Sequence, residues 1–273
     1  VEEETDFEVC QYVVSAEAVT AAAIPDAMIC LGESVDLDAD ASGGQLIDFG
    51  PYLGYAYFWD TGVPGDTVEV ITVSPTVPTD YTVTVTDFCG QVIEAVVSIG
   101  IHPQPVIDVT GGGNGCVPEL VTFGNPSYVP GSTCLWDFGD GSTSTDCGTV
   151  DHLFIDAGCY DIGLTVTSDE GCTSTELFND LVCVYDNPKA GFYWTPNSPS
   201  ILDPTIEVIN TAINAETYEY DFGGFFTTFE ENPIYTFPDV EEETDFEVCQ
   251  YVVSAEGCMD TVCQTVTIHE EIL

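Results

Sequence analysis

A chain of 273 residues is long enough for one large domain or for about two to three small ones. One basic residue stands against 48 acidic ones, and the formal net charge of −47 excludes a nucleic-acid interface and makes anionic membrane surfaces poor partners. A hydrophobic content of 44% excludes a disordered chain, and no apolar run reaches the length of a membrane span, so we expect no membrane insertion.

The segment 1–17 recurs without change at 240–256. In the later copy it reads as the penultimate strand of a β module with an acidic loop before it, whereas at 1–17 it has no module of its own. Three interpretations stay open: an excerpt from a longer repetitive chain, a duplicated strand that pairs with another domain or chain, or a sequence assembled with an error.

Residues 18–102 read as a first β module. Apolar and polar residues alternate from Ser34 to Asp40, which is typical of a strand with one buried face. A Pro-containing joint, His102–Pro105, follows, and it is expected to be short and stiff because proline restricts both its own backbone and that of the preceding residue.

The clearest pattern lies in the middle of the chain, where Trp136-Asp137-Phe138-Gly139-Asp140-Gly141 precedes an alternating strand at 160–166. Weaker copies of this pair occur at 57–62 with 81–85 and at 218–223 with 246–248. Three copies predict three similar β modules, at 18–102, 103–186 and 187–273. Short Pro-containing joints between them favour an extended, semi-rigid rod.

The corner at 136–141 together with the strand that begins at Tyr160 closely resembles the PKD (polycystic-kidney-disease-type) repeat. The resemblance is strong for 103–186 and fair for 188–273, where Tyr220 replaces the tryptophan and Gly224 the second aspartate. It is weakest for 18–102, which looks like the PKD-like repeats of bacterial surface adhesins. The resemblance implies an all-β chain of three tandem Ig-like β-sandwiches, found in extracellular proteins that serve as spacers, adhesive stalks or surface-layer components.

Twelve cysteines without any Cys-x-x-Cys pair predict disulfides rather than a zinc site, and therefore an oxidising, extracellular location. Residues equidistant from a hairpin turn face each other across strands. This predicts the pairs Cys134–Cys147, Cys159–Cys183 and Cys249–Cys263. We further expect Cys30 to pair with Cys89 and Cys116 with Cys172, each tying the start of a module to its last hairpin.

Cys10 and Cys258 are left over, one near each end of the chain. One hypothesis is that the N-terminal strand of one copy docks on the end of another, which would build a filament head to tail. The alternative, slightly favoured, is that both thiols are free or paired otherwise.

Two groups of acidic residues are candidate Ca²⁺ ligands, because hard cations prefer carboxylate and carbonyl oxygens. They are the corner residues Asp137, Asp140 and Asp146, and the run Asp239, Glu241, Glu242, Glu243 and Asp245. The competing interpretation is that Asp and Gly build a tight corner and that the acidic run is a solvated loop. No other cofactor is expected.

Catalysis has little support, because His102, His152 and His269 fall in different modules and no nucleophile or phosphate-binding motif occurs. We therefore expect a non-catalytic structural or adhesive part of a secreted or cell-surface protein, with copies of itself or surface glycans as partners. The alternatives are a carbohydrate-binding accessory segment of a secreted hydrolase and a surface-layer component.

Overall fold

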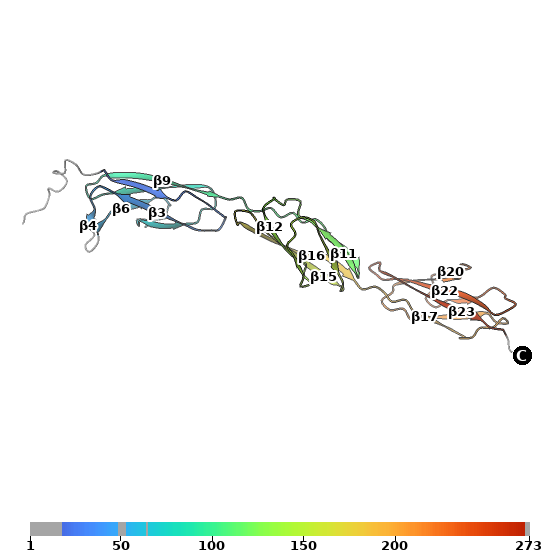
Figure 1. Cartoon of the computed structure of the whole chain (residues 1–273). Helices are drawn as coiled ribbons and strands as arrows, with labels where there is room; N and C mark the ends of the chain where they lie inside the picture. Colours follow the sequence, from blue (N-terminus) through green and yellow to red (C-terminus); the bar gives the residue numbers. More distant parts are fainter. Residues whose placement is uncertain (1–17, 49–52, 64, 271–273) are drawn as a thin grey trace, which may run out of the picture. The chain divides into compact units, whose positions relative to one another are not determined.

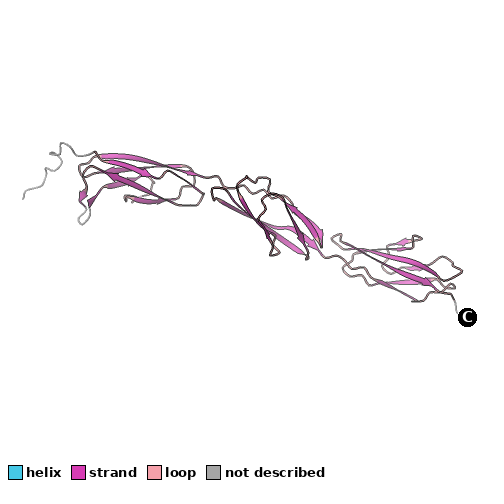
Figure 2. Cartoon of the chain, in the orientation of Figure 1, coloured by secondary structure: helices cyan, strands magenta, loops and turns pink. Residues whose placement is uncertain are grey.

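The computed structural model describes residues 18–48, 53–63 and 65–270. These residues form strands and loops and no helix, so the predicted all-β fold is confirmed (Figures 1 and 2). Strand pairing divides them into three groups that follow one another along the chain, and among the described residues no strand pairs outside its own group. The predicted module boundaries at 102–103 and 186–187 stay a prediction.

The first group holds a three-stranded sheet in the order β1-β3-β7, a four-stranded sheet in the order β2-β9-β8-β6, and the small pair β4-β5. Their bounds are β1 (Thr20–Ile24), β2 (Ala27–Ile29), β3 (Val35–Ser42), β4 (Ile47–Asp48), β5 (Leu53–Gly54), β6 (Ala56–Trp59), β7 (Val70–Val73), β8 (Thr79–Thr86) and β9 (Val92–Ile101). Alternating side chains of the two larger sheets share one core, in which Leu37 and Val83 are fully buried.

The second group holds a five-stranded sheet in the order β10-β16-β15-β12-β13 and the pair β11-β14. Their bounds are β10 (Gly113–Cys116), β11 (Glu119–Phe123), β12 (Thr133–Asp137), β13 (Thr143–Ser144), β14 (Val150–Phe154), β15 (Gly158–Thr167) and β16 (Thr173–Tyr185). Aromatic rings connect the two sheets: Phe123 on β11 lies 5.9 Å from Trp136 on β12, and Phe154 on β14 lies 4.6 Å from Tyr160 on β15, measured between ring centroids.

The third group holds a three-stranded sheet in the order β17-β18-β21 and a four-stranded sheet in the order β20-β19-β22-β23. Their bounds are β17 (Phe192–Thr195), β18 (Thr205–Asn210), β19 (Thr217–Phe222), β20 (Thr227–Thr228), β21 (Ile234–Thr236), β22 (Thr244–Val253) and β23 (Met259–Ile268). Val208, Tyr220 and Val248 are fully buried in the core that the two sheets share.

The same indole position recurs in the first two groups. Trp59 on β6 and Trp136 on β12 are almost completely buried, and each ring nitrogen donates to a backbone carbonyl, that of Val68 at 3.0 Å and that of Asp146 at 2.9 Å. In the third group the hydroxyl of Tyr220 donates to the carbonyl of Glu231 at 3.2 Å. In all three groups, a large ring with one polar atom therefore connects its strand (β6, β12 or β19) to a following loop.

A short segment runs parallel to the last strand in each group. β2 pairs with β9, β10 pairs with β16, and Ser200 bridges to His269. Cys30 directly follows the first of these segments and Cys116 ends the second.

By compactness, the chain divides into two units, one formed by residues up to 106 with 129–133 and 166–174, the other by 107–128, 134–165 and the residues from 175 onward.

Candidate functional site

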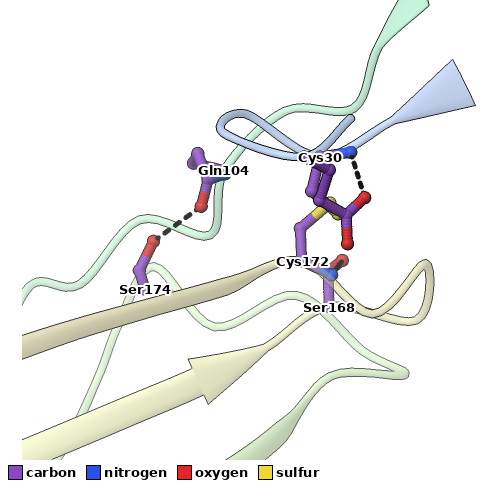
Figure 3. The surroundings of a disulfide bond; sticks show 6 residues. Cys30, Gln104, Ser168, Cys172 and Ser174 are labelled. Atoms are coloured by element: carbon purple, nitrogen blue, oxygen red, sulfur yellow. Dashed lines mark hydrogen bonds between the residues drawn. A yellow bond between two sulfur atoms is a disulfide. The ribbon is translucent and has the colours of Figure 1, made fainter. Parts of the chain in front are cut away.

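In the first unit, Cys30 forms a disulfide with Cys172, with 5.4 Å between the Cα atoms (Figure 3). Cys172 ends the turn between β15 and β16, and its amide donates to the hydroxyl of Ser168 at 3.3 Å. The amide of Cys30 donates to a carboxylate oxygen of Glu33 at 2.9 Å. Beside them, the hydroxyl of Ser174 donates to the carbonyl of Pro105 at 2.7 Å.

In the second unit, Cys116 forms a disulfide with Cys258, with 5.7 Å between the Cα atoms. Both long-range disulfides span 142 residues of sequence. The expected pairs Cys30–Cys89 and Cys116–Cys172 are therefore wrong, and Cys258 is not a thiol left over for contact between chains. The expectation failed because it placed both partners in one module.

The three hairpin disulfides are present as predicted. Cys134 pairs with Cys147, Cys159 with Cys183, and Cys249 with Cys263. Cys249 and Cys263 face each other in the register of β22 and β23. Cys89 is also disulfide-bonded, whereas Cys10 lies outside the described residues, so the proposed role of 1–17 stays a prediction.

The candidate Ca²⁺ corner is held by hydrogen bonds within its own turns. One oxygen of Asp140 accepts from the amide and hydroxyl of Ser142, at 2.9 and 2.5 Å, and the other lies 2.7 Å from Nε2 of His152. Asp137 accepts from the amide of Gly139 at 3.0 Å. Burial raises the pKa of Asp140, but the hydrogen bonds from Ser142 and His152 outweigh it and hold that pKa below its ordinary value.

Asp140, Ser142 and His152 do not form a nucleophile–base relay. The hydroxyl of Ser142 and the carboxylate of Asp140 both approach the same ring nitrogen, Nε2, at 3.3 and 2.7 Å. A catalytic triad needs the acid on one nitrogen and the nucleophile on the other. The imidazole also stacks on the buried ring of Phe138 with 4.1 Å between centroids.

The candidate acidic run is exposed at Asp239, Glu241, Glu242, Glu243 and Asp245. Two of these carboxylates have protein partners: Glu243 lies 3.0 Å from Nδ1 of His269, and Asp245 accepts from the hydroxyl of Thr267 at 2.6 Å. In the described part of the chain, the cluster with potential metal-ligand spacing is Glu247, Cys249 and Cys263, whose two sulfurs are already joined in a disulfide.

A groove of about 690 Å³ in the second unit is lined by small residues and three carboxylates, those of Asp186, Glu216 and Glu256. Its lining contains no histidine, and its cysteine, Cys159, is disulfide-bonded. The groove therefore offers neither a histidine base nor a thiolate nucleophile. Within the described residues, no helix is long and apolar enough to cross a membrane.

The family model of the PKD domain matches residues 102–182. Residues 102–182 carry a PKD domain. The Asp140 corner, Trp136 and the Cys159–Cys183 disulfide all lie in this PKD domain or at its end. The family resemblance inferred from the corner motif is therefore confirmed for the middle of the chain.

One similar curated protein is a microbial collagenase of Vibrio alginolyticus, 38% identical over 71 residues, which are 24% of this chain and 9% of the collagenase. Collagenase ColQ1 of Bacillus cereus (strain Q1) is 34% identical over 76 residues, 26% of this chain and 8% of that protein. The chain thus matches less than a tenth of the length of either relative.

Among solved structures, the PKD1 domain of the Vibrio cholerae metalloprotease PrtV is similar with a TM-score of 0.26 and 23% identity, covering 30% of this chain and 98% of that domain. A Ca²⁺-stabilised adhesin of an Antarctic bacterium that binds ice matches with a TM-score of 0.41 and 16% identity, covering 94% of this chain and 75% of the adhesin.

Proposed function

We propose that the chain is a non-catalytic, load-bearing segment of a secreted or cell-surface protein, built of three β modules at 18–102, 103–186 and 187–273. The observation that carries the proposal is the pair of long-range disulfides, Cys30–Cys172 and Cys116–Cys258. Each joins a cysteine beside the parallel edge segment of one strand group to the last hairpin turn of the next group.

Because disulfides are covalent, these two bonds give a pulling force a shorter route between the two ends of the chain, called here the disulfide bypass. A pull on the C-terminal end passes through β23 to Cys258, and the disulfide leads from there directly to Cys116. From Cys116 the shortest covalent route runs through 117–171 to Cys172 and across the second disulfide to Cys30. The segment 173–257, which contains β16 to β22, lies on a loop beside this route. Force applied to the two ends therefore stretches other parts of the chain while this segment stays slack.

The same bonds support an extracellular location. Disulfides persist in oxidising compartments, and small β domains without large cores use them for stability. The net charge of −47 keeps such chains apart from one another in solution. Both properties suit a surface stalk, and neither serves a catalytic purpose.

Single-molecule force spectroscopy tests the proposal, with handles at the two ends of the oxidised chain. In the double variant Cys116→Ser/Cys258→Ser, tension between position 258 and Cys30 must follow the 86 residues from 258 to 172 (258 − 172) instead of the 56 residues between Cys116 and Cys172 (172 − 116), so the stretched chain should be about 100 Å longer. The matched control, Cys159→Ser/Cys183→Ser, should leave the stretched length nearly unchanged, because Cys172 lies 13 residues from Cys159 and 11 residues from Cys183 (172 − 159 and 183 − 172). Equal stretched lengths in the wild type and in the Cys116→Ser/Cys258→Ser variant would show that the bypass does not exist.

A second candidate is an accessory module of a secreted hydrolase, favoured by the 38% identity with a collagenase segment. Cosedimentation with insoluble collagen and with insoluble polysaccharides separates the two proposals. Micromolar binding that survives in the Cys116→Ser/Cys258→Ser variant supports the accessory role, whereas no binding together with the force bypass supports the stalk.

A further inference from the structure

Two hairpins of the chain have the same backbone. In the second group Trp136 faces Ser144 across β12 and β13, and in the third group Tyr220 faces Thr228 across β19 and β20. Each turn is closed by the same hydrogen bond, from Phe138 N to Ser142 O at 3.2 Å in the second group and from Phe222 N to Phe226 O at 2.9 Å in the third. Phe226 therefore occupies the place of Ser142, and Phe225 that of Gly141.

The side chains at these equivalent places differ in kind. The second group has a polar cluster in which Ser142 contacts His152, and His152 stacks on Phe138. In the third group Tyr235 stacks on Phe222 at 4.3 Å between centroids, and Phe226 lies over Tyr235 at 5.5 Å with an interplanar angle of 7°. Aromatic residues have thus replaced polar ones at the surface of the same hairpin.

The replacement leaves a large apolar surface in water. Phe225, Phe226 and Phe229, called here the Phe patch, are 63%, 48% and 74% exposed. The hairpin does not need them, because Gly141 and Ser142 build the same turn in the second group. Three exposed phenylalanines within five residues are typical of an interaction surface.

The charge around the Phe patch limits what can occupy it. Asp221 lies at the base of the turn, where it accepts from the amide of Gly224 at 2.8 Å, and Glu230 and Glu231 directly follow Phe229. A second copy of this chain would bring only one basic residue, Lys189, and 48 acidic ones. A partner with basic side chains around an apolar centre matches both the rings and the surrounding carboxylates.

We propose that the Phe patch is a docking site for a cationic, amphipathic segment of another protein. The apolar face of such a segment covers the three rings, and its Lys or Arg side chains reach Asp221, Glu230 and the ring faces. The binding surface belongs to the third group and is independent of the disulfide bypass.

Fluorescence anisotropy with two labelled peptides of equal charge tests the proposal on the full oxidised chain. One peptide alternates Lys and Leu, and the other alternates Lys and Ser. The chain should bind the Lys/Leu peptide at least about tenfold more tightly than the Lys/Ser peptide. The triple variant Phe225→Ser/Phe226→Ser/Phe229→Ser should lose this preference, whereas the control Leu120→Ser/Leu153→Ser, which removes exposed apolar side chains from β11 and β14, should keep it.

Equal affinity for both peptides, or a preference that survives in the triple variant, would overturn the proposal. Two further results would also overturn the proposal if they depend on the Phe patch. Binding of a neutral β-glucan oligosaccharide would make the patch a glycan-binding site, and dimerisation in analytical ultracentrifugation would make it a contact between copies. Circular dichroism melting of the triple variant confirms that the third group is folded.

Discussion

Cys172 and Cys258 hold the same position in two turns that have the same hydrogen bonds. Ser168 N donates to Cys172 O at 2.8 Å, and Ser254 N donates to Cys258 O at 2.8 Å. In each turn the serine hydroxyl accepts from the cysteine amide, at 3.3 and 3.2 Å. Both turns present their cysteine in the same way, and each cysteine bonds one in the preceding strand group.

Peptide mapping under non-reducing conditions should recover the linked pairs Cys30–Cys172 and Cys116–Cys258. Partial reduction should open them independently of the hairpin pairs, because the hairpin cysteines are also held by the strand register. A peptide that links Cys116 to Cys172 would contradict the arrangement. The variant Cys116→Ser/Cys258→Ser is a control in which the Cys30–Cys172 peptide should remain.

Gln250 is a second point where the third group should be sensitive. It is completely buried on β22, donates through Nε2 to Tyr220 at 2.7 Å and to Asn210 at 2.8 Å, and accepts from the amide of Gly191 at 2.7 Å. Gln250→Ala should lower the free energy of unfolding by about 2–4 kcal/mol, because it leaves buried polar groups without partners and opens a cavity.

Urea denaturation followed by tyrosine fluorescence measures this loss. The control is Gln264→Ala on β23, whose side chain is partly exposed and donates to the carbonyl of Phe192 at 2.7 Å. That variant should lose only about 1 kcal/mol. Equal losses in the two variants would show that the buried network contributes nothing of its own.

The sequence was enough to predict what depends on local register. Alternation placed Leu37 and Leu164 in the core, and equidistance from a turn paired Cys134 with Cys147, because neighbouring strands bring such residues face to face. The aromatic corner at Trp136 identified the family for the same reason, since its role is set within a single hairpin.

The long-range disulfides could not be predicted in this way, because no local rule relates residues that are 142 positions apart. A signal was nevertheless present. Cys116 follows Cys30 by the same number of residues as Cys258 follows Cys172, 86 in each case (116 − 30 and 258 − 172). Both cysteines of the second bond therefore lie the same distance further along the chain than those of the first bond. This is expected when the same bond forms between each pair of successive repeats.

The Phe patch was missed because alternation describes strands, and its residues lie in and just beyond a hairpin turn. Aligning the turn of the third group with that of the second would have shown Phe225 and Phe226 in the places of Gly141 and Ser142. The structure supplied the exposure of the rings, which a single sequence does not contain.

The Ca²⁺ hypothesis for the corner at Asp140 can be tested by thermal melting in EDTA and in CaCl₂. Because both oxygens of Asp140 already have partners in Ser142 and His152, Asp140→Ala should lower the melting temperature equally in the two buffers. Asp169→Ala, which removes an exposed carboxylate from the turn between β15 and β16, is the control and should have a smaller effect in both buffers. If Ca²⁺ raises the melting temperature of the wild type and not that of Asp140→Ala, the corner is a calcium site.

Acid should destabilise the first strand group through Asp87. This residue is 2% exposed, and its carboxylate accepts from the amides of Gln45 at 3.0 Å and Gln91 at 2.8 Å and from Nε2 of Gln91 at 3.2 Å. Burial raises the pKa of Asp87, but these hydrogen bonds outweigh it and leave the pKa below its ordinary value in the folded chain.

Because the folded chain holds the proton less tightly than the unfolded chain, the stabilisation by Asp87 is complete above the ordinary pKa of an aspartate and is lost as the pH falls toward the lowered value. Asp87→Asn should therefore weaken the first group at pH 7 and flatten the acid limb of its stability profile. Urea denaturation followed by Trp59 fluorescence between pH 7 and pH 3, in variants that lack Trp136 and Trp194, measures both effects. Asp80→Asn, an exposed carboxylate on β8, is the control, and an acid limb equally steep in wild type and Asp87→Asn would show that other carboxylates cause it.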